Sequence, residues 1–380
     1  PWLQACSLPS PPCRNQPQLS SGIEIDASGQ SVWLGAWVLQ RSFKGFSSVR
    51  FGQKNSPHRL KPLWSQAEPK GQKMGDMRIK YSVIIPTYNR EPLLAEALRS
   101  VQAALPDCSE VIVVNDGTEF ERRTCDLIET LGAVAVKTKG GLGAGAARNI
   151  GADCARGQWL LFLDDDDLIA VGYWQAVARY IDAYFQSTDL AYGFCRANPQ
   201  SDRRAMQHAA AAQTVFHIRP QVGTSLRSKI AGLGLGFWVS KTLFQKVGGI
   251  NPELRTNEDT DFCLKLLGAG ARCHNTPSQG AVIFQGDHGR AAASSTTKRY
   301  GPRQRARYFK HILDSQAEIL ATDSKTQSWL WKRYLKMEAR AGGMQGYQSL
   351  RKAAGLAAGR KRLLAACWAV WRVLAKLDRR

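Results

Sequence analysis

The sequence contains no Cys-x-x-Cys pair, although nine cysteines are scattered between Cys6 and Cys367. This argues against a zinc ribbon or a thioredoxin-like redox site, and a dispersed, odd-numbered set is typical of a reducing cytosol. No apolar run reaches the roughly 18–20 residues that a helix needs to cross a bilayer. The Asp-x-Asp-x-Asp-Gly loop of an EF-hand, with Glu at its twelfth position, is absent, which excludes that calcium module.

Acidic residues are few compared with basic ones. The 380 residues include 52 Lys+Arg against 31 Asp+Glu, for a formal net charge of +21. Such an excess favours anionic partners, namely nucleotides, nucleic acid or an anionic membrane surface, and it does not determine the fold. The chain is 44% hydrophobic, which is sufficient for one large α/β domain with extensions.

Residues 1–76 differ in composition from the rest of the chain, being rich in Pro, Ser, Gln and Gly. Their apolar patch, residues 31–39, is too short to span a membrane and too far from the start for a usual signal peptide. We expect this segment to be largely disordered. Met74 and Met77 stand just before the first clear strand. We therefore hypothesise that residues 1–73 are a gene-start artefact. If a protein that starts at Met74 lost folding or activity, that result would argue against the hypothesis.

The most informative stretch is 159–167, in which five apolar residues run directly into four consecutive carboxylates. A continuous apolar run predicts a strand buried on both faces, as in a parallel sheet covered by helices. Open α/β sheets bind ligands at the carboxyl ends of such strands. Because adjacent carboxylates repel one another, we expect a cation among them, and oxygen ligands favour Mg²⁺ or Mn²⁺. A solvated acidic loop is the alternative interpretation.

Further strands and helices alternate along the chain, which predicts an α/β fold with a mostly parallel sheet flanked by helices. Short apolar runs predict strands at 81–85, 111–114, 134–136, 190–194 and 281–284. Helical spacing of apolar residues predicts helices over about 90–105, 171–185, 242–247 and 257–267. The polar, alanine-rich residues 197–213 predict a loop.

A glycine-rich stretch between a predicted strand and a predicted helix mimics a dinucleotide-binding loop. Gly141, Gly143 and Ala146 fit the G-x-G-x-x-A pattern. The unit is third along the chain, and the next strand ends in four acids where ribose recognition needs one, so the sequence argues against that interpretation. The glycines still permit close approach of the backbone to a phosphate.

Polar residues near strand ends are candidates for binding an anionic ligand. Asp116 follows a predicted strand, so it would face the same crevice as Asp164, although Asn-Asp-Gly is also a common turn. Thr87, Arg90 and Arg148 are further candidates, with a solvated surface as the alternative.

Two residues in the second half of the chain are candidates for chemistry. Asp259 shares a predicted helix face with Phe262, so it should point inward and is a candidate general base. Its neighbours Glu258 and Asp261 are explained by the helix dipole alone. His288 follows a predicted strand and is a candidate to complete a metal site with Asp166, although a lone histidine is more often structural.

Taken in order, six segments of the chain resemble the family 2 glycosyltransferases of GT-A fold. The segments are Tyr81–Arg90, Val111–Thr118, Gly143–Gly151, Trp159–Leu168, Val247–Leu254 with Glu258–Leu267, and Asp287–Ser295. The resemblance covers roughly 81–295, a little over half the chain. It implies a GT-A (Rossmann-like) sheet and a hexosyltransferase-type activity, in which a sugar passes with inversion from a nucleotide-diphosphate sugar to an acceptor hydroxyl with the help of Mg²⁺ or Mn²⁺.

The resemblance also implies roles for individual residues. Those placed around the nucleotide sugar are Pro86, Thr87, Tyr88, Arg90, Asp116, Arg148, Asp164 and Asp165. In this assignment Asp164 lies near the ribose, Asp166 binds the metal, and Asp259 takes the proton of the acceptor hydroxyl. Because aspartate also stands at positions 165 and 167, the choice of metal ligand among the four acids remains open. Acceptor specificity is expected in 190–250 and beyond 290.

Two other classes of function compete with this interpretation. A metal-dependent nucleotidyltransferase also uses paired aspartates, but it would not need the helix that begins at Glu258 and Asp259. A basic protein that binds nucleic acid or a membrane surface would explain the charge, yet the sequence carries no recognised nucleic-acid motif. We therefore expect three regions: the disordered segment 1–76, a glycosyltransferase domain over 77–295, and a basic helical region over 296–380.

The last predicted helix has the features of an interfacial helix. Its apolar face consists of Leu363, Cys367, Val370, Trp371, Leu374 and Leu377, flanked by lysine and arginine. We expect it to hold a cytoplasmic protein on the membrane face, where an acceptor linked to a lipid would be reached. The alternative is a helix that docks this face on the catalytic domain.

Overall fold

The computed structural model describes residues 23–25, 31–33, 79–212, 214–285 and 300–377. Within the N-terminal segment, β1 (Ile23–Ile25) and β2 (Ser31–Trp33) pair as a short antiparallel hairpin. The segment therefore includes a small piece of regular structure that its composition did not predict. The remainder of 1–76 lies outside the described residues, as does His288.

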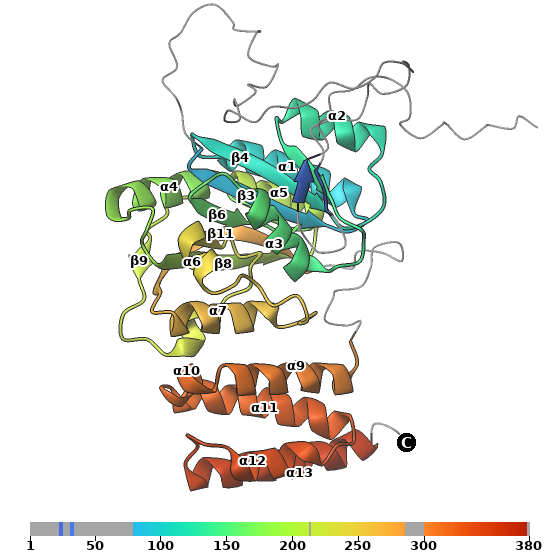
Figure 1. Ribbon diagram of the computed structural model, residues 1–380, viewed down its shortest axis with the longest axis vertical. Helices are drawn as coiled ribbons and strands as arrows, with labels where there is room; N and C mark the ends of the chain where they lie inside the picture. Colours follow the sequence, from blue (N-terminus) through green and yellow to red (C-terminus); the bar gives the residue numbers. More distant parts are fainter. Residues whose placement is uncertain (1–22, 26–30, 34–78, 213, 286–299, 378–380) are drawn as a thin grey trace, which may run out of the picture.

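A mixed, mostly parallel sheet of nine strands forms the centre of the protein (Figure 1). The strands are β3 (Tyr81–Thr87), β4 (Ser109–Asn115), β5 (Val134–Lys137), β6 (Trp159–Phe162), β7 (Leu168–Ile169), β8 (Ala191–Gln200), β9 (Arg219–Pro220), β10 (Trp238–Ser240) and β11 (Arg272–Phe284). Their order is β5-β4-β3-β6-β10-β8-β11-β7, with β9 also paired to β11. Strands β5, β4, β3 and β6 are parallel, and β10 runs antiparallel to both β6 and β8.

Helices cover both faces of the sheet, as the continuous apolar strands require. One face packs against α1 (Glu91–Ala104), α2 (Arg122–Thr130) and α4 (Tyr173–Tyr184). The other packs against α3 (Ala144–Cys154), α6 (Lys241–Lys246) and α7 (Glu258–Gly268). Buried rings such as Trp174 and Phe262 fill the two layers. The predicted α/β fold with a mostly parallel, helix-flanked sheet is confirmed.

The prediction of a loop over 197–213 was wrong. Strand β8 continues to Gln200, and α5 (Arg203–Ala211) follows, capped by the side chain of Asp202. Only Met206 and Ala210 are buried on this helix, where they pack near Leu168 of β7. Because these two positions form a narrow apolar stripe on an otherwise polar segment, helical periodicity was too weak to predict the helix.

The C-terminal region is helical, as predicted, and its layers stack beyond α7 at the far side from β3 and β4 (Figure 1). Its helices are α9 (Pro302–Ser315), α10 (Ala317–Ala321), α11 (Ser324–Arg340), α12 (Gln345–Lys352) and α13 (Ala358–Leu377). They share one core, in which Phe309, Leu330 and Trp368 join Leu254 and Leu264 from the sheet-bearing part. The short 3₁₀ helix Leu226–Lys229 also reaches this region, because Asp323 accepts a hydrogen bond from the Leu226 N–H at 2.9 Å.

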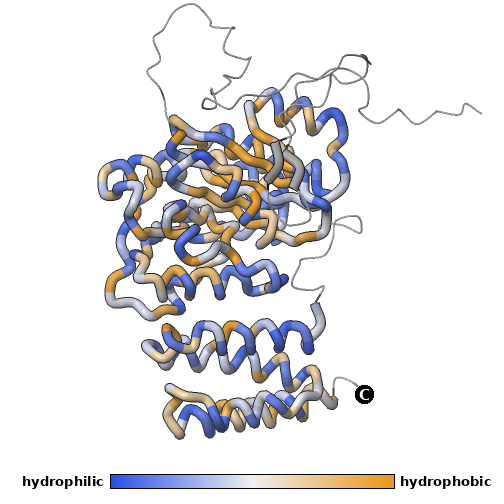
Figure 2. The backbone as a smooth tube through the Cα atoms, viewed as in Figure 1, coloured by the Kyte–Doolittle hydropathy of each residue, from blue (hydrophilic) through white to orange (hydrophobic). Residues whose placement is uncertain are grey.

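Helix α13 carries apolar residues on two faces. Leu364, Trp368 and Ala375 are buried, and the helix packs on α11 and α12 rather than on the sheet. The face predicted from the sequence is largely exposed, with 64% of Leu363, 57% of Val370, 50% of Leu374 and 58% of Leu377 accessible. Hydrophobic and hydrophilic residues alternate along the backbone of this helix (Figure 2). Among the described helices, none is long and apolar enough to cross a membrane.

Candidate functional site

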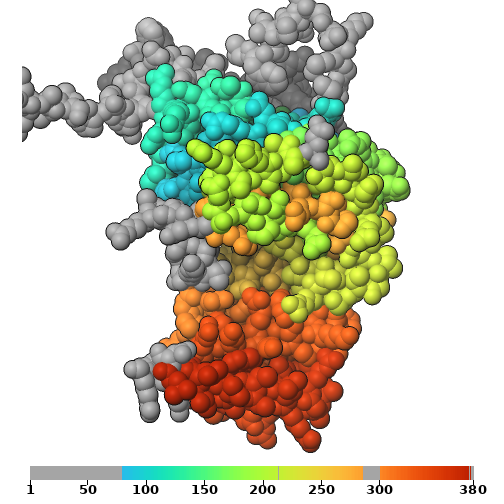
Figure 3. All heavy atoms as spheres, turned by 180° about the vertical axis from the view of Figure 1, so that it is seen from behind, coloured from blue at the N-terminus to red at the C-terminus, as the bar shows by residue number. Residues whose placement is uncertain are grey.

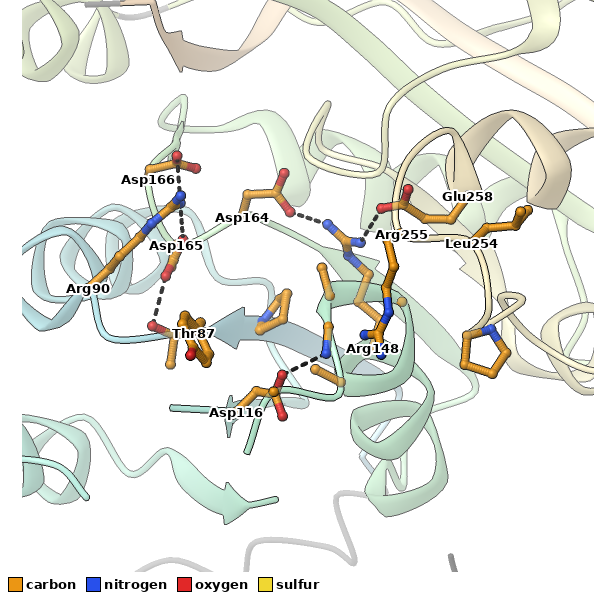
Figure 4. Close-up of a pocket in the computed structure, with 18 of the residues that line it drawn as sticks. Thr87, Arg90, Asp116, Arg148, Asp164, Asp165, Asp166, Leu254, Arg255 and Glu258 are labelled. Carbon is orange, nitrogen blue, oxygen red and sulfur yellow. Dashed lines mark hydrogen bonds and ion pairs between the residues drawn. The ribbon is translucent and has the colours of Figure 1, made fainter. Parts of the chain in front are cut away.

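A cavity of about 510 Å³ lies at the edge where β3, β4 and β6 end (Figure 4). Parallel strands place their carboxyl ends together, so residues far apart in the sequence meet here. The predicted site residues that line the cavity are Pro86, Thr87, Tyr88, Arg90, Asp116, Arg148, Asp164, Asp165 and Asp166. The structure thus brings together the nine predicted residues that come from the first half of the chain.

Two residues hold the acid run in place: Thr87, the last residue of β3, and Arg90, which follows the strand. Thr87 Oγ1 donates a hydrogen bond of 2.8 Å to Asp165 Oδ2. Arg90 Nη1 reaches Asp165 Oδ1 at 3.1 Å and Asp166 Oδ2 at 2.8 Å. Asp165 is buried, and burial together with the charge of Asp166 raises its pKa to about 7 against the lowering effect of Arg90. Asp165 therefore has both oxygens bonded within the protein, whereas Asp164 and Asp166 are more exposed.

Three of the four acids are placed as a divalent cation requires. One carboxylate oxygen each from Asp164, Asp166 and Asp167 lies within 4.8 Å of the others. Burial and the neighbouring carboxylates raise the pKa of Asp167 well above its usual range. Gly234 lies over this cluster, since a Cβ at that position would meet Asp164 Oδ2 at 2.6 Å. An all-oxygen donor set of three carboxylates suits Mg²⁺ or Mn²⁺.

Arg148 connects the acid run to the start of α7. Its buried guanidinium pairs with Asp164 and lies 3.6 Å from Glu258 Oε1 (Figure 4). Glu258 is half-buried, and burial raises its pKa to about 7 although Arg148 opposes the shift. The Arg148 Nε and Nη1 atoms are buried without a hydrogen bond to any described residue. The cavity wall therefore holds a cation with unused donors facing two carboxylates.

The glycine-rich stretch binds the carboxylate of Asp116 through its backbone. The backbone N–H groups of Leu142 and Gly143 donate to its carboxylate at 3.0 and 2.7 Å, and Thr138 Oγ1 also donates. Gly143 has φ of 91°, and a Cβ there would lie 2.1 Å from an Arg255 nitrogen. Glycine is thus required both by the backbone conformation and by the close approach of Arg255.

The three acids at the start of α7 have three different environments. Glu258 lines the cavity, and Asp261 is fully buried, where it accepts a hydrogen bond of 2.9 Å from Gln316. The helix dipole alone therefore does not account for these two residues. Asp259 is half-buried and does not line the cavity, and its Oδ1 accepts the Thr260 N–H at 2.6 Å. Burial raises the pKa of Asp259, which suits a proton acceptor.

Sequence reasoning missed several residues of the site. Arg255 and Tyr300 line the cavity, and Gly234 covers the acid cluster. No motif marks Arg255 or Tyr300, because both act through their position in the fold. Glu258 had a signal, since it stands beside Asp259 in the helix start that the resemblance singles out. The predicted metal ligand His288 lies outside the described residues and is not placed.

Comparison with known proteins indicates which family the domain around this site resembles. Residues 82–240 match the sequence model described as "Glycosyl transferase family 2". The chain carries a family 2 glycosyltransferase domain. An uncharacterized glycosyltransferase of Haemophilus influenzae is 31% identical over 190 residues, which are 49% of this chain and 61% of that protein. YwdF of Bacillus subtilis, also an uncharacterized glycosyltransferase, is 34% identical over 104 residues, 27% of this chain and 39% of YwdF. The chain thus spans less than two thirds of these relatives.

A solved structure agrees with the fold of the glycosyltransferase domain. The crystal structure of residues 1–349 of Staphylococcus aureus TarS, in complex with UDP-GlcNAc, superposes with a TM-score of 0.56 at 19% identity. The superposition covers 79% of this chain and 91% of that one. In sequence, TarS, a poly(ribitol-phosphate) β-N-acetylglucosaminyltransferase, is 33% identical over 114 residues, 28% of this chain and 19% of TarS. The domain therefore has the GT-A fold that the sequence predicted.

Proposed function

We propose that this protein transfers a sugar from a nucleotide-diphosphate sugar to an acceptor hydroxyl with inversion. The observation that carries the proposal is the position of Arg148, which contacts Asp164 on the acid run and Glu258 on α7. The acid run and the Glu258–Asp259 helix start therefore belong to one site. A nucleotidyltransferase would need the acids alone, so this arrangement favours sugar transfer.

In this proposal the cavity binds the donor. Arg148 and Arg255 line the cavity, and their guanidinium groups would contact the diphosphate. Pro86, Thr87 and Tyr88 would lie around the nucleotide, with Arg90 holding Asp165 and Asp166 in place. Asp116 would contact the base, with the glycine-rich backbone fixing its carboxylate.

The acid cluster would hold the metal. Asp164, Asp166 and Asp167 fit a hard divalent cation, with Asp166 as the ligand that the sequence favours. When bound, such a cation would neutralise the charge that develops on the departing nucleoside diphosphate. Asp165 would support the neighbouring acids rather than bind the metal, since both of its oxygens already accept hydrogen bonds from Thr87 and Arg90.

Asp259 would act as the general base. Its raised pKa and its half-buried position, next to the cavity-lining Glu258, support this role. The acceptor hydroxyl would give its proton to Asp259 as its oxygen bonds to the anomeric carbon. The bond to the diphosphate breaks on the opposite face, which yields the inverted product.

The proposal is tested by measuring whether the protein releases nucleoside diphosphate or pyrophosphate. Purified protein is incubated with UDP- and GDP-sugars and Mn²⁺, and nucleoside diphosphate release is compared between the native protein and Asp166→Asn. We expect nucleoside diphosphate from at least one sugar donor and none from the variant. Release of pyrophosphate from a nucleoside triphosphate, without release of nucleoside diphosphate from any donor, would establish the nucleotidyltransferase instead.

We also propose that α13 rests on an anionic membrane surface. Four apolar residues of the predicted face are exposed on a helix that is already docked through its other face. Exposed apolar residues flanked by lysine and arginine are typical of helices at the lipid–water interface. The net charge of +21 supports the same placement, because each basic residue near an anionic surface contributes about 1 kcal/mol.

A further inference from the structure

A second concave surface lies between α11 and α13, outside the donor cavity. It is an open groove of about 630 Å³, and we call it the basic groove. The cations that line it are Arg227, Lys325, Lys332, Arg333, Lys336 and Arg360. The described lining contains no Asp or Glu, and its apolar residues are Trp329, Leu363, Leu364 and Cys367. The groove therefore combines cationic and apolar lining residues. The C-terminal helices that form it are red in the space-filling view of the opposite side (Figure 3).

The cations of α11 lie on one helix face. Lys325, Trp329, Lys332 and Lys336 recur at helical spacing, so their side chains line the groove together. Like charges on one face are unfavourable unless a counter-charge lies nearby. The groove thus concentrates positive charge that no described lining carboxylate balances.

Arg333 lies where the positive charges are most crowded. Its guanidinium lies 5.2 Å from the centre of the Trp329 ring, and Arg227 stacks on the same ring at 5.2 Å. Burial lowers the pKa of Arg333, the charge of Asp259 opposes this shift, and the charges of Arg305 and Arg227 add to it. The Nε of Arg305 is buried without a hydrogen-bond partner among the described residues. An anion bound here would relieve repulsion among three guanidinium groups.

The basic groove leads to the start of α7. Arg333 Nη2 lies 3.5 Å from Asn257 Oδ1, and Asn257 is the residue that precedes Glu258 and Asp259. The charge of Arg333 also acts on Asp259, where it opposes the rise in pKa caused by burial. Glu258 lines the donor cavity, and Asp259, the next residue of α7, interacts electrostatically both with Arg148 of the cavity and with Arg333 of the groove. The proposed base is thus linked to a cation of each surface.

We infer that the basic groove binds the acceptor, and that this acceptor is a saccharide joined through phosphate to an apolar chain. The cations around Arg333 would hold the phosphate, and the apolar lining residues, which include exposed Leu363 on α13, would hold the chain. This placement brings the saccharide beside Asp259. The inference rests on the proposed function, because it assigns the groove as the acceptor site of the same reaction.

Binding of simple amphiphiles tests the inference without requiring transfer. Octyl phosphate, octyl glucoside and inorganic phosphate are titrated into the full chain by isothermal titration calorimetry below the micelle concentration of each amphiphile. Octyl glucoside keeps the chain and removes the charge, whereas inorganic phosphate keeps the charge and removes the chain. We expect octyl phosphate to bind at least about tenfold more tightly than either of the other two compounds.

Two matched double variants locate the binding. Lys332→Gln with Lys336→Gln removes two charges from the groove, and Arg351→Gln with Lys352→Gln removes two from exposed positions on α12. The groove variant should bind octyl phosphate about 25-fold more weakly, from about fivefold for each lysine. The α12 variant should bind it as the native protein does. Equal weakening in both variants, or equal affinity for octyl phosphate and octyl glucoside, would overturn the inference.

Donor binding separates this inference from the proposed function. Binding of UDP or GDP with Mn²⁺ is measured in the same two variants, and we expect it to be unchanged in both, since neither pair lines the donor cavity. A native protein that binds octyl phosphate in the groove but no nucleotide would refute the proposed function alone. Nucleotide binding without groove binding would refute the acceptor site alone.

Discussion

The guanidinium of Arg90 donates a hydrogen bond of 2.8 Å to Asp166, the carboxylate proposed as the metal ligand. Arg90 also reaches Asp165 at 3.1 Å, so one cation partly balances an acid run that would otherwise repel itself. The negative charge of Asp166 still raises the pKa of both Asp165 and Asp167. Arg148 pairs with Asp164, yet the raised pKa values show that repulsion among the carboxylates is only partly balanced, and this has measurable consequences.

Replacing Asp166 with asparagine should uncouple stability from metal binding. Asp166→Asn keeps an acceptor oxygen for Arg90 and removes a charge, so without metal we expect a melting temperature above that of the native protein. The rise in melting temperature produced by Mn²⁺ in the native protein should disappear, because a ligand of the cluster is lost. Asp126→Asn, at an exposed position on α2, is the control and should leave both quantities unchanged. A native-like response of Asp166→Asn to Mn²⁺ would exclude Asp166 as a ligand.

The neighbours Glu258 and Asp259 should have separable roles, because only Glu258 lines the donor cavity. Asp259→Asn should lower kcat by about 10²–10⁴-fold, the usual contribution of a general base, with nearly unchanged donor affinity. Glu258→Gln should leave kcat much less affected and should lower the Kd of the nucleotide, since it removes a carboxylate from the cavity that receives an anion. Kinetics and calorimetry on the pair decide the assignment. Lost donor affinity with native kcat in Asp259→Asn would make Asp259 a donor ligand.

Arg148 should be important for stability as well as for donor binding. It is buried between Asp164 and Glu258, so Arg148→Met leaves two carboxylates without their partner. Removing one member of a buried ion pair typically costs about 3–5 kcal/mol, and urea unfolding should show a loss of this size. Adding Glu258→Gln should recover part of the loss, because one unpaired charge is removed. A double variant no more stable than Arg148→Met would show that Glu258 does not depend on Arg148.

His274 should make the protein sensitive to moderate acid. Burial lowers its pKa from 6.5 to about 4, and its ring packs against Trp238 and Phe185 while Nδ1 lies 3.1 Å from the Tyr180 hydroxyl. Between these two pKa values the unfolded chain binds a proton that the folded protein does not, so stability falls as the pH falls. From pH 7 to pH 5 this single group should remove about 2 kcal/mol.

The comparison that isolates this effect uses His274→Gln, which keeps a polar acceptor near Tyr180 and does not titrate. The variant should be less stable than the native protein at pH 7, and the difference between their unfolding free energies should shrink by pH 5. Subtracting the two proteins cancels the carboxylates, whose pKa values are shared by both. An unchanged difference between pH 7 and pH 5 would mean that His274 is protonated in the folded state.

The sequence brought most of the cavity-lining residues together because they sit at or just after strand ends. A strand such as 159–163 is visible as an apolar run, and the residue after it must lie at the sheet edge, which places Asp116 and Asp164 together. Loop residues lack that constraint. Arg255 enters the cavity only because the turn before α7 folds over Gly143, and no periodicity describes such a turn.

The C-terminal helices show a different limit of sequence reasoning. Periodicity found an apolar face on α13 and assigned it to a membrane or to docking on the catalytic domain. The helix instead docks on α11 through a second face, which includes Leu364 and Trp368. A helix with apolar residues on two faces gives a broad signal, so the pattern alone does not reveal which face the core uses. The basic groove was equally hidden, because its cations come from three separated segments.

The exposed stripe of α13 gives the last prediction. Val370→Gln, Leu374→Gln and Leu377→Gln together remove apolar surface that is 50–58% accessible, so the melting temperature should stay close to native. If the stripe enters the lipid interface, binding to anionic vesicles should fall by at least about tenfold, because each Val or Leu transferred from water contributes about 1.5–3 kcal/mol when fully buried. Co-sedimentation at low salt measures this, and high salt should weaken binding of the native protein.

A variant is preferable to deletion of the helix, because Leu364 and Trp368 cover the core that includes Leu330. The matched control is Val215→Gln with Val222→Gln, which removes apolar side chains that are 72% and 81% exposed elsewhere on the surface. It should pellet with vesicles as the native protein does. If the stripe variant also pellets like the native protein, the membrane does not contact this face of α13, and the vesicle affinity comes from the charge of the molecule alone.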